Sequence, residues 1–111
     1  MLKRFAQFIN ESEDRTVYDM SALYPLEKWI ETFMDKVDTL NDATRDKWFK
    51  LAEQDFDEDT MKILDARYSA DQLHYFQGGG TVATGGIDTY DFIFNFKHIS
   101  QNAEDLYNKV K

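Results

Sequence analysis

The clearest pattern along the chain is a run of apolar residues at helical spacing that follows Pro25. Apolar residues that recur every three to four positions form one face of an α-helix. Proline suits the first turn of such a helix, because it has no N–H group to leave unpaired. The sequence therefore predicts an amphipathic helix whose buried face is made by Leu26, Trp29, Ile30, Phe33, Met34, Val37 and Leu40.

Two more helices are predicted by their capping residues. Asn41-Asp42 can end the first helix and cap a second one, from about Ala43 to Asp55, because short polar side chains accept hydrogen bonds from the free N–H groups at a helix start. Asp57 can cap a third helix in the same way. Phe56 and Met61 stand at the two positions that often pack together around such a cap.

The hydrophobic period changes towards the end of the chain. Tyr90, Phe92, Phe94 and Phe96 alternate with other residues, which is typical of a β-strand with one aromatic face. Upstream, glycine clusters separate short β-prone segments and so predict turns. Helices followed by strands indicate an α+β fold. We expect a single α+β domain over residues 12–111, with three main helices, a three-stranded antiparallel meander and a short C-terminal helix capped by Ser100; the glycine clusters are Gly78-Gly79-Gly80 and Gly85-Gly86.

Composition narrows the class of protein. Of the 111 residues, 42% are hydrophobic and 15% aromatic, which excludes a fully disordered acidic chain. Without cysteine, neither a disulfide nor a thiolate metal site can form. The formal net charge is −8, and residues 11–71 hold 17 acidic against 8 basic side chains. This acidity argues against direct binding to nucleic acid or to an anionic membrane, and no apolar run approaches the ~20 residues that span a bilayer.

The acidic run from Asp55 to Asp59 has the spacing of a calcium loop at its first, third and fifth positions. Two required residues are missing, because Thr60 stands where the loop needs glycine and Ala66 stands where it needs a bidentate glutamate. Acidic residues at the positive end of a helix explain the run better. We therefore expect no metal and no cofactor.

Two further patterns are weighed as catalytic or binding sites. Gly78-Gly79-Gly80 lacks the following helix and lysine of a phosphate loop, so it is interpreted as a flexible turn that can serve as a partner-binding tip. His74 and His98, together with Lys97, could cleave a phosphodiester by acid–base catalysis, which makes a small nuclease a minor alternative. The chain has no basic groove for a polyanion, so we expect no enzyme.

The exposed face of the first predicted helix carries Glu27, Glu31, Asp35 and Asp38. Carboxylates repeated along a helix can occupy a basic surface of another protein. The other interpretation is an ordinary solvated helix face, which Lys28 and Lys36 interrupt. These four residues and the glycine tip are the candidate partner-binding residues.

The N-terminal segment is basic and amphipathic, with Phe5 and Phe8 among its apolar residues. Residues 1–11 resemble the short capsid-targeting peptides of internal head proteins in T-even-like tailed phages, which end in Leu/Ile-x-Glu. Ile9-Asn10-Glu11 matches that ending, so the resemblance implies cleavage after Glu11, with Ser12 as the new first residue. The alternative is an ordinary terminal helix that packs on the core through Phe5 and Phe8.

These observations together predict a non-enzymatic phage accessory protein. The resemblance implies that it acts in the host cytoplasm or is packaged in the virion head. There it would bind and modulate a host or viral protein with a basic surface, for example in counter-defence. The alternative is a structural or assembly protein that self-associates through its sheet edge or its aromatic surface.

Overall fold

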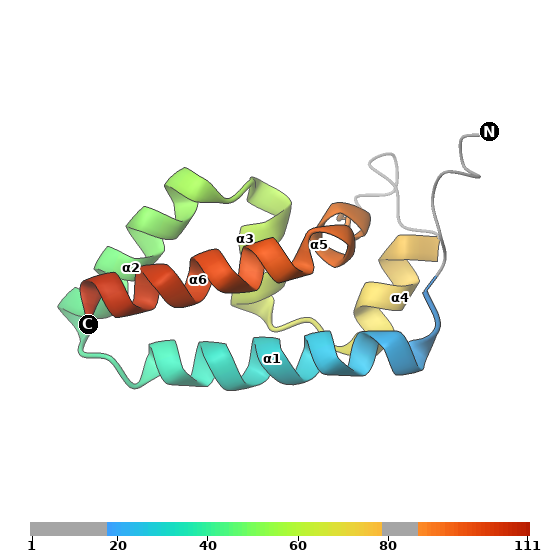
Figure 1. Ribbon diagram of the computed structural model, residues 1–111, viewed down its shortest axis with the longest axis horizontal. Helices are drawn as coiled ribbons and strands as arrows, with labels where there is room; N and C mark the ends of the chain where they lie inside the picture. The colour runs from blue at the N-terminus through green and yellow to red at the C-terminus, as the bar shows by residue number, and fades with distance from the viewer. Residues whose placement is uncertain (1–17, 79–86) are drawn as a thin grey trace.

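The structure, a computed structural model, describes residues 18–78 and 87–111. Within these ranges every regular element is a helix, and no strand occurs (Figure 1). The expected α+β fold is therefore wrong, and the described chain is all-helical. The helices are α1 (Met20–Asp38), α2 (Asp42–Asp55), α3 (Glu58–Ala66), α4 (Ala70–Gly78), α5 (Tyr90–Phe94) and α6 (Phe96–Val110).

The first three helices agree with their sequence signals. The side chain of Asn41 accepts a hydrogen bond from the amide of Thr44 at 2.9 Å, and Asp57 accepts one from Thr60 at 2.8 Å, so both predicted caps are confirmed. The start of α1 differs from the prediction. Asp19 caps it, and Pro25 lies inside the helix rather than in its first turn.

The predicted meander is replaced by helices wherever the structure describes it. Residues 73–77 belong to α4, and residues 90–96 span α5 and the start of α6. Phe92 is only 1% exposed and its neighbour Ile93 is also buried, whereas Phe94 is 66% exposed. A strand would place Phe92 and Phe94 on the same face, so this burial pattern requires a helical turn. Residues 79–86, with the rest of the expected turns, lie outside the described residues.

The C-terminal helix is longer than the sequence analysis expected. It begins at Phe96, so Ser100 lies inside α6 and does not cap it. The hydroxyl of Ser100 instead donates to the carbonyl of Lys97 at 3.1 Å. α6 buries Ile99, Ala103, Leu106 and Tyr107 against the other helices.

Figure 1 shows α1 and α6 as the two long helices of the molecule. α2 packs on α6, α4 packs on α1, and α1 also contacts α2, α3 and α6. Aromatic rings fill the space between them: Phe33 stacks on Trp29 with ring centroids 4.9 Å apart and lies 5.5 Å from Trp48. Phe33 also meets the ring of Tyr107 on α6 at 6.1 Å.

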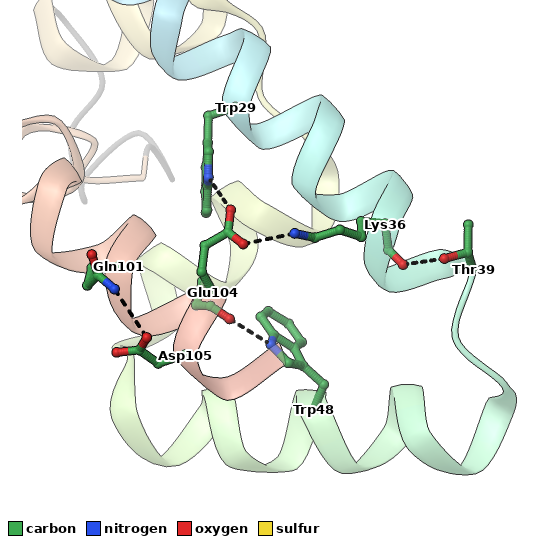
Figure 2. Close-up of polar contacts among 8 residues, drawn as sticks. Trp29, Lys36, Thr39, Trp48, Gln101, Glu104 and Asp105 are labelled. Carbon is green, nitrogen blue, oxygen red and sulfur yellow. Dashed lines mark hydrogen bonds and ion pairs between the residues drawn. The ribbon is translucent and has the colours of Figure 1, made fainter. Parts of the chain in front are cut away.

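Two tryptophan side chains also connect the helices through hydrogen bonds (Figure 2). On α1, the indole N–H of Trp29 donates to the carboxylate of Glu104 at 3.2 Å, and Lys36 Nζ lies 2.9 Å from the same carboxylate. On α2, the buried indole of Trp48 donates to the carbonyl of Ala103 at 3.2 Å. Glu104 and Ala103 are adjacent on α6, so this helix is held to both α1 and α2 at one level. None of the described helices is both long enough and apolar enough to cross a membrane.

Candidate functional site

The acidic face predicted on α1 is divided by an arginine from another helix. Arg67 Nη1 donates to Asp35 Oδ1 at 2.8 Å, and Arg67 Nη2 donates to the carboxylate of Asp38. The hydrogen bond with Asp38 is the main reason that the pKa of Arg67 is raised above its ordinary value. Asp35 and Asp38 therefore serve as tertiary contacts that hold the end of α3 against α1.

The backbone at Arg67 explains how its side chain reaches α1. Arg67 ends α3 with a left-handed conformation, φ 57°, and its N–H bonds back to the carbonyls of Ile63 and Leu64. The following amide of Tyr68 bonds to the carbonyl of Ile63 at 3.2 Å. Bonds of this kind end a helix sharply, usually with glycine at the left-handed position. No glycine marks this turn in the sequence, so the sequence gives no local signal for it.

The other half of the acidic face, Glu27 and Glu31, takes no part in the ion pairs with Arg67. Glu31 is exposed and Glu27 is half-buried, and neither forms an ion pair with any described residue. Two carboxylates at (i, i+4) spacing on an exposed helix face are also what a solvated surface looks like. The structure thus leaves Glu27 and Glu31 as the accessible part of the predicted binding face.

Several residues of the predicted binding and processing sites lie at the end of a described range or outside the described ranges. Gly78 is the last residue of α4, while Gly79 and Gly80 lie outside the described residues. The predicted processing residues Ile9, Glu11 and Ser12 also lie outside them. The partner-binding tip and the cleavage after Glu11 therefore stay predictions.

The two histidines have different surroundings. His74 is on α4, and its charge contributes to lowering the pKa of Asp19 at the start of α1, after the larger effects of the Ser21 hydroxyl and the Ala22 amide. His98 is on α6, where its Nε2 lies 3.2 Å from the side-chain nitrogen of Asn102. The described contacts do not bring the two imidazoles into one group with Lys97, so the geometry adds nothing to the nuclease alternative.

A groove that the sequence analysis did not identify lies between α2 and α3. Phe49 and Met61 are half-buried within it and pack against the core. The exposed acids Glu53, Glu58 and Asp65 also line this groove, and its one basic residue, Lys62, pairs with Glu58 at 3.2 Å. The groove has a volume of about 270 Å³. We call it the α2–α3 groove; it combines apolar surface with an acidic rim.

A second cavity lies where the α2–α3 connection meets α5 and α6, and we call it the junction cavity. Its volume is about 180 Å³. Among the described residues, no group of three or more His, Asp or Glu side chains is placed to hold a metal ion. Its lining residues are Asp55, Phe56, Asp57, Thr60, Asp91, Asn95, His98, Ile99 and Asn102.

Comparison with known proteins gives no relative for this chain: no family model, no curated protein and no solved structure matches it. The resemblance of residues 1–11 to phage targeting peptides therefore stays a prediction.

Proposed function

We propose that this chain is a non-enzymatic protein that binds a basic, amphipathic segment of a partner protein in the α2–α3 groove. The observation that carries the proposal is the apolar pair Phe49 and Met61 set between exposed carboxylates. Helical segments dock in such grooves by burying their apolar face. Carboxylates around the apolar surface favour a segment that carries lysine or arginine, and they speed its association.

Charge makes the α2–α3 groove a better candidate than the acidic face of α1. Three carboxylates line the groove against one lysine, which itself is paired with Glu58. On α1, Asp35 and Asp38 are both paired with Arg67, which offsets one of their two charges, so a basic partner would compete with an internal ion pair.

The resemblance of residues 1–11 supports placing the partner in a phage-infected cell. On this proposal the partner is a host or viral protein with a basic surface, met in the host cytoplasm or after packaging in the virion head. Binding would cover the partner's basic surface, which is one way for an accessory protein to act in counter-defence.

Self-association through aromatic surface is the second candidate. Tyr24, Tyr75 and Phe94 are large aromatic side chains that stand exposed on α1, α4 and α5. The route through a sheet edge loses its basis, because the described ranges contain no strand. Sedimentation equilibrium separates the candidates: a stable oligomer that dissociates on replacing Phe94 and Tyr75 by serine favours assembly, and a monomer favours partner binding.

The binding proposal is tested with a defined probe. A fluorescent peptide of leucine and lysine at helical spacing is titrated with the full chain, and its affinity is compared with that of a leucine/glutamate peptide. The groove variant is Glu53→Gln with Asp65→Asn. The matched control is Glu27→Gln with Glu31→Gln, which removes the same charge from α1.

We expect the leucine/lysine peptide to bind and the leucine/glutamate peptide not to bind. The groove variant should weaken binding about tenfold, because each exposed ion pair contributes up to ~1 kcal/mol. The control variant should stay within about twofold of the original chain. Equal losses in the two variants would show general attraction to an acidic protein, and the proposed site would then be rejected.

A further inference from the structure

The junction cavity is built from two distant parts of the chain. The α2–α3 connection contributes Asp55 and Asp57, and α5 contributes Asp91. Asn95, His98 and Asn102, from α6 and its start, and Thr60 are the other polar lining residues, and no lysine or arginine is among them. The cavity is therefore lined by three exposed carboxylates that no lysine or arginine in the lining neutralises.

The carboxyl end of α2 strengthens this negative charge. Asp55 is the last residue of α2, where the free carbonyl groups already carry partial negative charge, and the last turn of α2 has no basic residue. The amino end of α3 has the opposite charge, but Asp57 caps it and Glu58 and Asp59 lie in its first turn. A carboxylate placed at a helix C-terminus is unfavourable by itself and becomes favourable when a cation binds beside it.

A buried hydroxyl provides an independent sign of a ligand. Thr60 lines the cavity and is only 5% exposed. Its amide is bonded to Asp57, but its hydroxyl has no hydrogen-bond partner among the described residues. Buried polar groups in folded proteins nearly always have a partner, so a ligand in the cavity that Thr60 lines is a candidate partner for its hydroxyl.

We infer that the junction cavity binds a primary ammonium group carried on an apolar stem. An ammonium has three donors, which suit carboxylate oxygens and the oxygen of Thr60. Phe56 and Ile99 supply apolar wall for the stem. A volume of about 180 Å³ accommodates a short aminoalkyl chain.

The same geometry argues against a metal ion as the ligand. A divalent cation needs several oxygen ligands close to one point. No group of three His, Asp or Glu side chains in the described part of the chain has that placement. An organic cation tolerates carboxylates that are spread around a cavity. Such an ammonium comes from a free polyamine or from a lysine side chain of a partner protein.

The test uses the full chain labelled with ¹⁵N and four probes, added one at a time and followed by amide chemical shifts. Diaminobutane represents a free polyamine. Nα-acetyl-lysine amide, whose side-chain ammonium is free, represents a lysine side chain. Butanol is the uncharged control of similar size, and calcium is the metal control. The cavity variants are Asp55→Asn with Asp91→Asn, and separately Thr60→Val. The charge-matched control is Asp46→Asn with Asp71→Asn, two exposed carboxylates on α2 and α4 that line neither the cavity nor the groove.

We expect saturable shifts at residues 56–60 and 91–95 with at least one of the amines, and none with butanol. The double cavity variant should weaken binding about tenfold and Thr60→Val about threefold, while the control variant Asp46→Asn with Asp71→Asn should leave it unchanged. Binding of both amines assigns the site to lysine recognition, and binding of diaminobutane alone assigns it to polyamines.

Three outcomes would overturn the inference: no saturation with either amine, an equal loss in the control variant Asp46→Asn with Asp71→Asn, or calcium binding at the same amides. Because Thr60→Val conserves shape and the aspartate changes are isosteric, helical circular dichroism verifies that each variant is folded. The leucine/lysine peptide experiment depends on different residues, so failure of one site does not decide the other.

Discussion

Phe92 and Phe94 stand two residues apart, and replacing each by alanine tests the all-helical arrangement of the C-terminal part directly. Phe92 is buried in the core, whereas about two thirds of Phe94 is exposed. Truncation of a buried phenylalanine costs about 3–5 kcal/mol, because it removes apolar burial and leaves a cavity. A domain of this size has a total stability of only about 5–15 kcal/mol, so Phe92→Ala should remove about a third or more of it.

The expected cost at Phe94 is far smaller. Burying a whole phenylalanine side chain contributes ~1.5–3 kcal/mol, so the covered third of Phe94 contributes about 0.5–1 kcal/mol. Alanine is the better helix former by up to ~0.5 kcal/mol, which offsets part of that loss. Phe94 also stacks on Tyr90 with ring centroids 6.1 Å apart, and truncation removes this contact. The net change for Phe94→Ala should therefore stay within about 1 kcal/mol.

Urea unfolding followed by tryptophan fluorescence measures both changes, and Phe92→Leu provides a milder core variant if Phe92→Ala does not fold. Ile93→Ala completes the series. Ile93 is buried beside Phe92, so its truncation should cost about 2–5 kcal/mol. In a strand, Phe92 and Phe94 would share a face and Ile93 would point away. Equal costs at Phe92 and Phe94, with little effect at Ile93, would refute the helical arrangement.

Three more predictions concern the contacts between helices and the helix ends. Arg67→Gly should be about 1 kcal/mol more stable than Arg67→Ala in urea unfolding. Both variants lose the ion pairs, but only glycine adopts a φ of 57° without a steric cost. Glu104→Ala should destabilise by about 1–2 kcal/mol and Glu104→Gln by less, since the amide can still accept from Trp29. Because both variants lose the ion pair with Lys36, the destabilisation by Glu104→Gln relative to the original chain should shrink in high salt. The lowered pKa of Asp19 means that its contribution to stability is present above its unfolded pKa, near 3.8, and is lost as the pH falls through the lower folded value. The original chain should therefore be more stable than Asp19→Ala at neutral pH, and this difference should become smaller as the pH falls towards 2. Thermal unfolding of both proteins between neutral pH and pH 2 measures it.

The segment around Phe92 shows why a short window misled the sequence analysis. Four aromatic residues at alternate positions satisfy the period of a strand, but Phe92 and Phe96 also satisfy the period of a helix. The helical pattern continues beyond this window to Val110, and the strand pattern does not. A longer window would have favoured the helix through Phe92, Phe96, Ile99, Ala103, Leu106, Tyr107 and Val110, all buried or half-buried in the structure.

Helix starts were more predictable than helix ends. Asn41 and Asp57 act locally, on an amide three residues further along, so their role can be inferred from their type and position. Arg67 ends α3 without such a signal. Its unusual backbone conformation accompanies contacts with α1, which begins far earlier in the chain. Tertiary contacts of this kind override local propensity and cannot be deduced from the neighbouring residues.

The same contacts change the interpretation of the charge pattern. A row of carboxylates along a helix indicates an acidic face, but the sequence does not reveal which of them an arginine from another helix will neutralise. Once Asp35 and Asp38 are paired with Arg67, the α2–α3 corner is the densest acidic region of the described chain: residues 53–65 hold six acidic side chains and one lysine. Crowded like charges oppose folding unless cations or opposite charges lie nearby. Both proposed sites lie at this corner. A positively charged partner or ligand bound there reduces the repulsion between these carboxylates. The free energy of unfolding should therefore rise as the concentration of that partner or ligand is raised.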